Sequence, residues 1–222
     1  MKQKERVHLN GGEMLFRVGA ALSFLLCIAT LGAMAAGLVV SGGGRIGWQF
    51  LTGVSSRLPD RAGVLPALAG TVWVTGLAMI VALPLGVGAA VYLEELCRRG
   101  RVSRILEIFI SNLAGVPAIM YGMVSLQIFV RWCGLGRTVI AGALTMALVV
   151  LPLIILVSRE AIRAVPRDIR EASLALGASK MQTIWYQVIP AALPGILTGA
   201  ILGVCRIIGE AAPLLALGAL TY

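Results

Sequence analysis

Five long apolar runs constrain what this chain can fold into more than any other feature of its sequence. Each run holds about 18 or more residues without a charged side chain, which is long enough for a helix to cross the hydrocarbon core of a bilayer. Because 59% of the 222 residues are hydrophobic and only 13% are charged, too few polar side chains remain to coat a soluble domain of this size. We therefore predict an all-α, polytopic membrane protein with spans at residues 18–40, 64–93, 108–130, 138–158 and 188–205, the last of which continues beyond residue 205.

The basic residues are distributed unevenly between the segments that join these spans. A net charge of +9 would suggest nucleic-acid binding in a soluble protein. With a cytoplasmic N-terminus, however, thirteen Lys and Arg residues fall on cytoplasmic segments and five on external ones, which is the positive-inside distribution of membrane proteins. We therefore expect membrane lipid and no nucleic acid as a partner, with a cytoplasmic segment at 1–17, an external loop at 41–63 and a transmembrane core at 64–222.

The sequence contains no motif for catalysis by this chain itself. It has no GxxxxGK[ST], GxSxG or HExxH pattern, so it predicts neither an ATPase nor a hydrolase or metalloprotease. Its four cysteines stand singly, and only His8 offers a nitrogen ligand beside them. We therefore expect the cysteines to be buried packing residues and predict no metal site and no cofactor in this chain.

One polar stretch interrupts the apolar sequence, REASLALGASKMQTIWYQVIP at residues 170–190. Apolar residues recur at helical spacing on both sides of Gly177, which stands where a left-handed helix cap is expected. Ser179 and Gln182 form a capping-box pattern directly after it, so we predict a helix, a glycine turn and a second short helix. Two interpretations stay open: interfacial helices resting on lipid, or a rigid amphipathic knob that docks into a groove of a partner.

The same stretch resembles the EAA loop of permease subunits in bacterial ABC importers, whose pattern is Glu-Ala-Ala, three residues, Gly, nine residues and then Ile-x-Leu-Pro. Glu171, Ala172, Gly177 and Pro190 match this pattern in register, whereas Ser173 replaces the second alanine. The resemblance implies coupling helices, within a loop at 159–190, that sit in a cleft of a separate ATP-binding subunit. It assigns the coupling to Glu171, Ala172, Ser173 and Gly177.

Longer blocks resemble one branch of these permeases. The segments ALPLGVGAAVYLEE, NLAGVPAIMYG, AGALTMALVVLP and LPGILTGAILGVCRIIGEAAPLL are similar, in order and spacing, to A-type permease subunits of bacterial phosphate importers. The resemblance implies a type I, MetI-like helical bundle in the bacterial inner membrane, with inorganic phosphate as substrate. The implied partners are a second homologous permease subunit, two ATP-binding cassette subunits that hold ATP and Mg²⁺, and an external phosphate-binding protein. Six spans are implied as well, so the five found here leave the family's sixth span missing.

Arg206 and Glu210 are the two ionisable residues that we place inside a span. Each costs roughly 2.5 to 3.5 kcal/mol at mid-bilayer, and their spacing of four predicts that both lie on one helical face. The guanidinium fork suits phosphate oxygens, whereas in the alternative Arg206 snorkels to the outer headgroups and Glu210 pairs with it. The RIIGE segment matches the arginine-and-glutamate element of the phosphate permeases, which implies a substrate pathway through both residues, with Asn112 and Arg159 as further candidates. The family often has an arginine where Leu156 stands here.

Other functions stay open from the sequence. An ion-coupled secondary anion transporter would use Arg206 and Glu210 for ion or proton coupling and would run without ATP. An ABC permease for another anion would share the coupling loop but take a different substrate. A non-transporting membrane scaffold would keep the loop as a contact surface alone.

Overall fold

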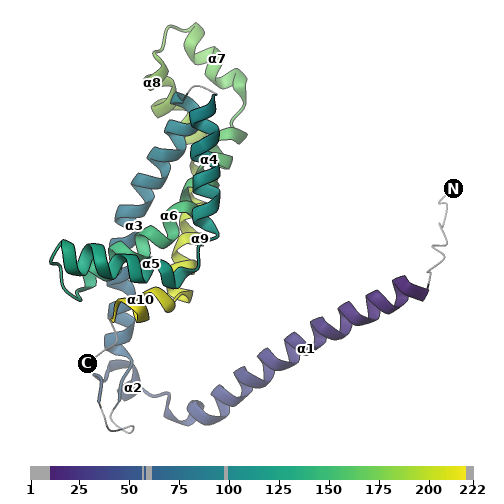
Figure 1. The fold of residues 1–222 in the computed structure, drawn as a ribbon, viewed down its shortest axis with the longest axis vertical. Coiled ribbons are helices and arrows are strands. Elements are labelled where there is room, and N and C mark those ends of the chain that lie inside the picture. The colour runs from purple at the N-terminus through teal and green to yellow at the C-terminus, as the bar shows by residue number, and fades with distance from the viewer. Residues whose placement is uncertain (1–10, 57, 59–61, 98–99, 219–222) are drawn as a thin grey trace. The chain divides into compact units, whose positions relative to one another are not determined.

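The computed structural model describes residues 11–56, 58, 62–97 and 100–218 (Figure 1). The chain divides into two compact units, residues 1–66 and 67–222. The first ten residues of the predicted cytoplasmic segment 1–17 lie outside the described residues, and His8 is among them. The same holds for seven of the basic residues used to predict the topology: Lys2, Lys4, Arg6, Arg57, Arg61, Arg98 and Arg99.

The first unit consists mainly of one long helix. α1 (Gly11–Gly42) is long and apolar enough to cross a membrane, and no part of its apolar window is buried within the chain. A helix that is apolar on all sides is suited to contact with lipid. The short 3₁₀ turn η1 (Gly43–Arg45) and helix α2 (Trp48–Thr52) follow it. The first predicted span is therefore confirmed as a helix, and it begins earlier than residue 18.

The second unit is a bundle of long apolar helices with α6 at its centre. Figure 1 shows α3 (Leu65–Val91), α6 (Val139–Ala164) and α9 (Ile189–Gly209) running side by side, and each belongs to a helix that could cross a membrane. The apolar window of α6 is 61% buried, against 33% for the helix that includes α3 and 28% for the one that includes α9. The three corresponding predicted spans are therefore confirmed as helices, with a shared core of Ala78, Ala82, Met146, Val150, Ile154 and Ile207.

Glycines let these helices approach one another closely. A Cβ added to Gly86 on α3 would lie 2.5 Å from Ile154 on α6. A Cβ added to Gly195 on α9 would lie 2.5 Å from Ala161 on α6, and Gly199 approaches the same helix one turn later. The GILTGAILG segment therefore packs α9 against α6 within the chain, as small residues at this spacing do in membranes.

We expect Gly86→Val to destabilise the bundle, and Gly88→Val on the same helix to leave it nearly unchanged. A valine at position 86 would overlap Ile154, and overpacking of this kind costs about 1–3 kcal/mol. A Cβ added to Gly88 meets nothing within 4 Å. Thermal unfolding of the two purified variants in detergent measures the difference, and equal melting temperatures would contradict this packing.

The prediction of a single helix for the third span, 108–130, is wrong. The structure has α4 (Arg101–Ala114) and α5 (Ala118–Ser125), with α5 continued by the π-helical turn η4 (Leu126–Trp132), and the two arms are bent by 99°. The chain bends because Gly115 ends α4 and Pro117, which has no amide hydrogen, stands before the next helix. By its geometry the pair is a broken span or a re-entrant loop.

The second arm of this pair packs against the last helix of the bundle, α10 (Ala212–Leu217). A Cβ added to Gly122 on α5 would lie 2.5 Å from the carbonyl oxygen of Pro213 and 2.7 Å from Cβ of Ala216. Figure 1 shows α5 and α10 lying across one end of the bundle, which we call the α10 end. The opposite end carries α7 (Arg167–Ala175) and α8 (Lys180–Thr183), and we call it the α7 end.

The polar stretch differs from the prediction in its second half. α7 is a separate short helix, but α8 continues through the π-helical turn η5 (Ile184–Val188) into α9 without a break. Pro190 does not stop this helix, because it directly follows the π-helical turn η5, and proline is tolerated in membrane helices where a local π-helical adjustment accommodates the missing amide. The predicted second short helix is therefore the first part of the last span.

The prediction that the cysteines are buried is also wrong for most of them. Cys27, Cys133 and Cys205 are exposed on the chain, and Cys97 is half-buried. Cys27 and Cys205 lie on exposed faces of α1 and α9, because a membrane protein presents apolar side chains to lipid or to another subunit as readily as to its own core. Within the described residues, no group of three or more His, Cys, Asp and Glu side chains is placed to hold a metal ion.

Candidate functional site

The predicted docking stretch forms a knob at the α7 end of the bundle (Figure 1). After α7 and Leu176 the chain turns at Gly177, whose φ of +87° lies in the left-handed region that favours glycine. The Ser179 hydroxyl accepts a hydrogen bond from the Gln182 amide, and the Gln182 side chain accepts one from the Ser179 amide. The glycine turn and the capping box are therefore confirmed, and they hold the knob in one conformation.

Three of the four residues predicted to couple to an ATPase lie on the outer surface of this knob. Glu171, Ala172 and Gly177 are exposed. Ser173 is half-buried, and its hydroxyl lies 2.9 Å from the Thr183 hydroxyl, within hydrogen-bonding distance. Large apolar side chains are exposed on the same stretch: Leu174, Leu176, Met181, Trp185 and Tyr186. A carboxylate among exposed apolar side chains is a surface suited to a groove of a partner protein.

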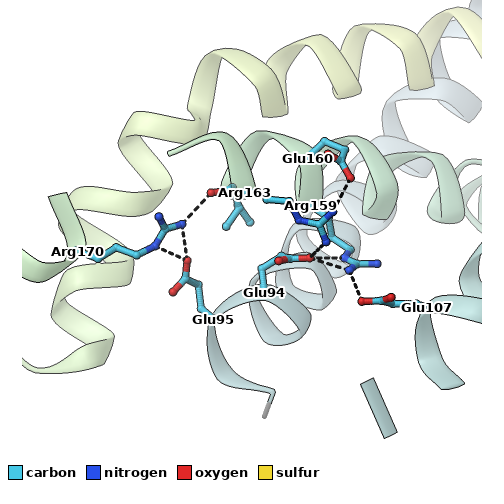
Figure 2. Close-up of polar contacts among 8 residues, drawn as sticks. Glu94, Glu95, Glu107, Arg159, Glu160, Arg163 and Arg170 are labelled. Atoms are coloured by element: carbon cyan, nitrogen blue, oxygen red, sulfur yellow. Dashed lines mark hydrogen bonds and ion pairs between the residues drawn. The ribbon is translucent and has the colours of Figure 1, made fainter. Parts of the chain in front are cut away.

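A cluster of ion pairs lies at the base of the knob (Figure 2). Arg159 on α6 donates to Oε1 of Glu94 from Nε at 2.9 Å and from Nη2 at 2.7 Å, and to Oε1 of Glu107 on α4 at 2.7 Å. Arg163, one turn further along α6, reaches the same Glu94 oxygen at 2.7 Å. Glu94 and its neighbour Glu95 belong to the π-helical turn η3 (Tyr92–Leu96), which extends α3. The cluster therefore joins α6 to α4 and to the end of α3.

Sequence reasoning missed the acidic members of this cluster. In the sequence, Glu94 and Glu95 stand in a block that resembles the phosphate permeases, and none of the quoted motifs contains Glu107. A signal was present, since two adjacent carboxylates directly after an uncharged span are unusual on a side of the membrane that is otherwise basic. Arg159, a candidate for the substrate pathway, lies in this cluster with its side chain 7% exposed.

Arg206 lies at the α10 end, near the end of α9. It lines a cavity of about 60 Å³ together with Tyr121 of α5 and Leu156 of α6. The Tyr121 hydroxyl donates to the carbonyl oxygen of Leu113 at 2.7 Å, across the bend between α4 and α5. The bend that the sequence did not predict therefore forms one wall of the cavity beside Arg206. Leu156 stands where the phosphate permeases often have an arginine, and it also lines this cavity.

Glu210 does not share a helical face with Arg206, contrary to the prediction. α9 ends at Gly209, and Glu210 has an extended backbone with φ of −112° and ψ of 104°. A continued helix would need an amide hydrogen from Pro213 for the Gly209 carbonyl, and proline has none. Among the described residues Arg206 and Glu210 form no ion pair. Asn112 is exposed on α4 and is not among the residues that line the cavity.

Long apolar helices with a polar knob at one end define a multi-pass membrane protein of the permease type, and solved structures share this fold. An inward-facing MetNI methionine ABC transporter aligns with a TM-score of 0.55 and 23% identity, over 66% of this chain and 68% of that one. An amino acid ABC transporter with histidines aligns with a TM-score of 0.52 and 21% identity, over 68% of this chain and 71% of that one. The bundle therefore has the MetI-like fold of ABC transporter permeases.

The chain belongs to the family of binding-protein-dependent transport system inner membrane components, which it matches over residues 82–221. It is 38% identical over 202 residues to the probable ABC transporter permease protein YqgI of Bacillus subtilis, covering 89% of this chain and 69% of that protein. It is 40% identical to the phosphate transport system permease protein PstA 1 of Mycobacterium tuberculosis and 35% identical to PstA of Haemophilus influenzae, over 78% and 70% of this chain. The chain spans 57% and 55% of the length of those two relatives.

Proposed function

We propose that this chain is a permease subunit of an ATP-driven importer that moves inorganic phosphate into the cell. The observation that carries the proposal is the exposed knob with Glu171, on a chain that belongs to a binding-protein-dependent transport family and contains no nucleotide-binding motif. Relatives named as phosphate permeases support phosphate as the anion. In this proposal two ATP-binding cassette subunits bind ATP and Mg²⁺, and this chain itself catalyses no reaction.

The proposed orientation places the α7 end in the cytoplasm of a bacterium and the N-terminus on the same side of the inner membrane. Arg159, Arg163 and Arg170 gather at the α7 end, and positive side chains are retained on the cytoplasmic side of membrane proteins. In this orientation Glu171 meets the ATP-binding subunit. The α10 end then faces an external phosphate-binding protein.

A second homologous permease subunit completes the pathway in this proposal. The hollow beside Arg206 has a volume of only about 60 Å³, and the chain therefore supplies one wall of a pathway more readily than a whole channel. The inner faces of paired subunits are the usual place for transport sites in membrane bundles. Arg206 supplies the positive charge for the phosphate oxygens. Glu210 lies beyond the end of α9 and is not among the residues that line this hollow, so the proposal gives it no contact with the phosphate.

The deciding experiment is to purify the permease with a neighbouring ATP-binding subunit and to measure ATP hydrolysis in proteoliposomes. We expect the ATP-binding subunit to remain attached, and hydrolysis to rise when the external binding protein is added with phosphate but not with sulfate. Stimulation by sulfate alone would make the chain a permease for another anion.

Two further outcomes would replace the proposal by a rival function. Phosphate uptake that continues without ATP and follows an imposed proton gradient would identify an ion-coupled secondary transporter. Stable attachment of the ATP-binding subunit without stimulation by any anion, and without uptake, would identify a membrane scaffold. Each result is read from the same vesicles, so the three functions are separated in one set of measurements.

A further inference from the structure

Two adjacent glutamates at the end of α3 serve two different parts of the chain (Figure 2). Glu94 pairs with Arg159 and Arg163, which both belong to α6. Glu95 pairs instead with Arg170, which belongs to α7. The π-helical turn η3 presents both carboxylates at the same end of the bundle. The turn η3 at the end of α3 therefore binds α6 through Glu94 and α7 through Glu95.

Arg170 makes the most extensive set of contacts at the base of the knob. Its Nε and Nη2 lie 2.9 Å and 2.8 Å from Oε1 of Glu95. Its Nη1 donates to the carbonyl oxygen of Val165 at 2.6 Å, and its Nη2 donates to that of Ile162 at 2.8 Å. Both carbonyls lie at the C-terminal end of α6, where helix carbonyls lack amide partners within the helix. Arg170 therefore binds the ends of α3 and α6 at the same time.

These contacts are shielded from solvent, which makes them stiffer than a surface ion pair. The side chain of Arg170 is 20% exposed and that of Glu95 is 11% exposed. A planar guanidinium that donates in several directions is held in one orientation, which a flexible ammonium group would not be. The polar side-chain contact described between α7 and the start of the last span is the hydroxyl pair of Ser173 and Thr183, and Ile169 of α7 packs against the apolar cluster that contains Val188 and Ala192.

We propose that Glu95 and Arg170 are positioning residues that fix the coupling helix α7 to α3 and α6, so that a movement imposed on α7 is passed to these two spans. Glu171, the neighbour of Arg170, faces outward on the same helix, so the residue that meets the partner and the residue that holds the bundle are adjacent. This role rests on the proposed function, since it requires an ATP-binding subunit that moves α7. Coupling of this kind needs a physical element with two arrangements that both sites influence.

The first test measures how firmly α7 is held, and it does not depend on transport. Spin labels are attached to cysteines that replace Asp168 on α7 and Tyr92 on η3, both exposed, in a chain whose four native cysteines are changed to serine, and the distance distribution is measured in the permease alone. We expect a narrow distribution in the unsubstituted chain and in Arg101→Ala, and a broad one in Arg170→Ala. Arg101 is an exposed arginine on α4 at the same end, with no described ion pair, so it controls for the loss of charge. Equal widths in Arg170→Ala and Arg101→Ala would overturn the proposal.

The second test measures phosphate taken up per ATP hydrolysed in proteoliposomes that hold the complete importer. We expect Arg170→Ala to keep the ATP-binding subunit attached and to hydrolyse ATP, with uptake per ATP lowered about tenfold, within the usual range of coupling between sites. Arg170→Lys keeps the ion pair but not the carbonyl contacts, so an intermediate loss is expected, and it tests the proposal if the alanine variant does not fold. Adding Glu95→Gln to Arg170→Ala should cause no further loss, because both changes break one interaction.

The outcomes separate this proposal from the proposed function. An unsubstituted importer that takes up no phosphate contradicts the proposed function, while the spin-label widths still decide whether the pair holds α7. A broad label distribution in Arg170→Ala with unchanged uptake per ATP would overturn the coupling role. Independent, additive losses from Glu95→Gln and Arg170→Ala would also overturn it, because the two residues would then act separately.

Discussion

Replacing Glu171 by lysine is expected to lower phosphate uptake by about a hundredfold, because a reversed charge at a protein interface costs several kcal/mol. Glu171 is exposed at the surface of the knob and has no described ion-pair partner within the chain, so the substitution leaves the fold of this chain intact. A partner surface that receives a carboxylate is complementary in charge and repels a lysine. Uptake of radiolabelled phosphate by cells that carry the variant measures the effect.

A matched variant separates docking from a general effect of charge. Glu160→Lys makes the same reversal at the same end of the bundle, but on α6 and outside the knob, where Glu160 is 71% exposed and, within the described part of the chain, pairs only with Arg163. Exposed pairs of this kind contribute about 0–1 kcal/mol, so uptake should remain close to normal. The amount of the variant in the membrane fraction measures insertion, and co-purification measures attachment of the ATP-binding subunit. Normal uptake by Glu171→Lys would remove the coupling role from this residue.

The features that the sequence predicted correctly depend on neighbouring residues alone. A long uncharged run favours a membrane helix, and four of the five predicted spans are long apolar helices in the described structure. The turn at Gly177 and the capping box of Ser179 and Gln182 are also local, because each needs only residues within one helical turn. The MetI-like fold followed from blocks of resemblance in a fixed order.

The features that were missed depend on residues far apart in the sequence. Arg159 and Glu94 are 65 residues apart, and Arg170 and Glu95 are 75 apart. Nothing in either segment shows which arginine meets which glutamate, since that depends on how the helices pack. The bend at Gly115 and Pro117 was missed for a different reason. Proline is tolerated within the other spans, as at Pro84, Pro152 and Pro194, so its presence does not distinguish a bent helix from a continuous one.

Arg206→Ala is expected to lower phosphate uptake by at least about thirtyfold, because losing one partner of a charged hydrogen bond costs about 2 kcal/mol or more. Arg206 is exposed towards the cavity that it shares with Tyr121 and Leu156, and it forms no described ion pair that would make it structural. The ATP-binding subunit should stay attached, since the knob lies at the opposite end of the bundle. Uptake into proteoliposomes and co-purification are measured on the same preparation.

Two control variants decide whether Arg206 binds the anion or anchors the helix. Arg131→Ala removes an arginine that is also exposed but lies on η4 and donates to Gln127, so uptake should be retained. Arg206→Lys keeps a positive charge that can snorkel to headgroups but loses the planar fork for phosphate oxygens. An anchoring role predicts that the lysine variant transports normally, whereas a phosphate contact predicts a weakened apparent affinity for phosphate. Because Leu156 supplies no second arginine here, the dependence on Arg206 should be stronger than in a permease that has one.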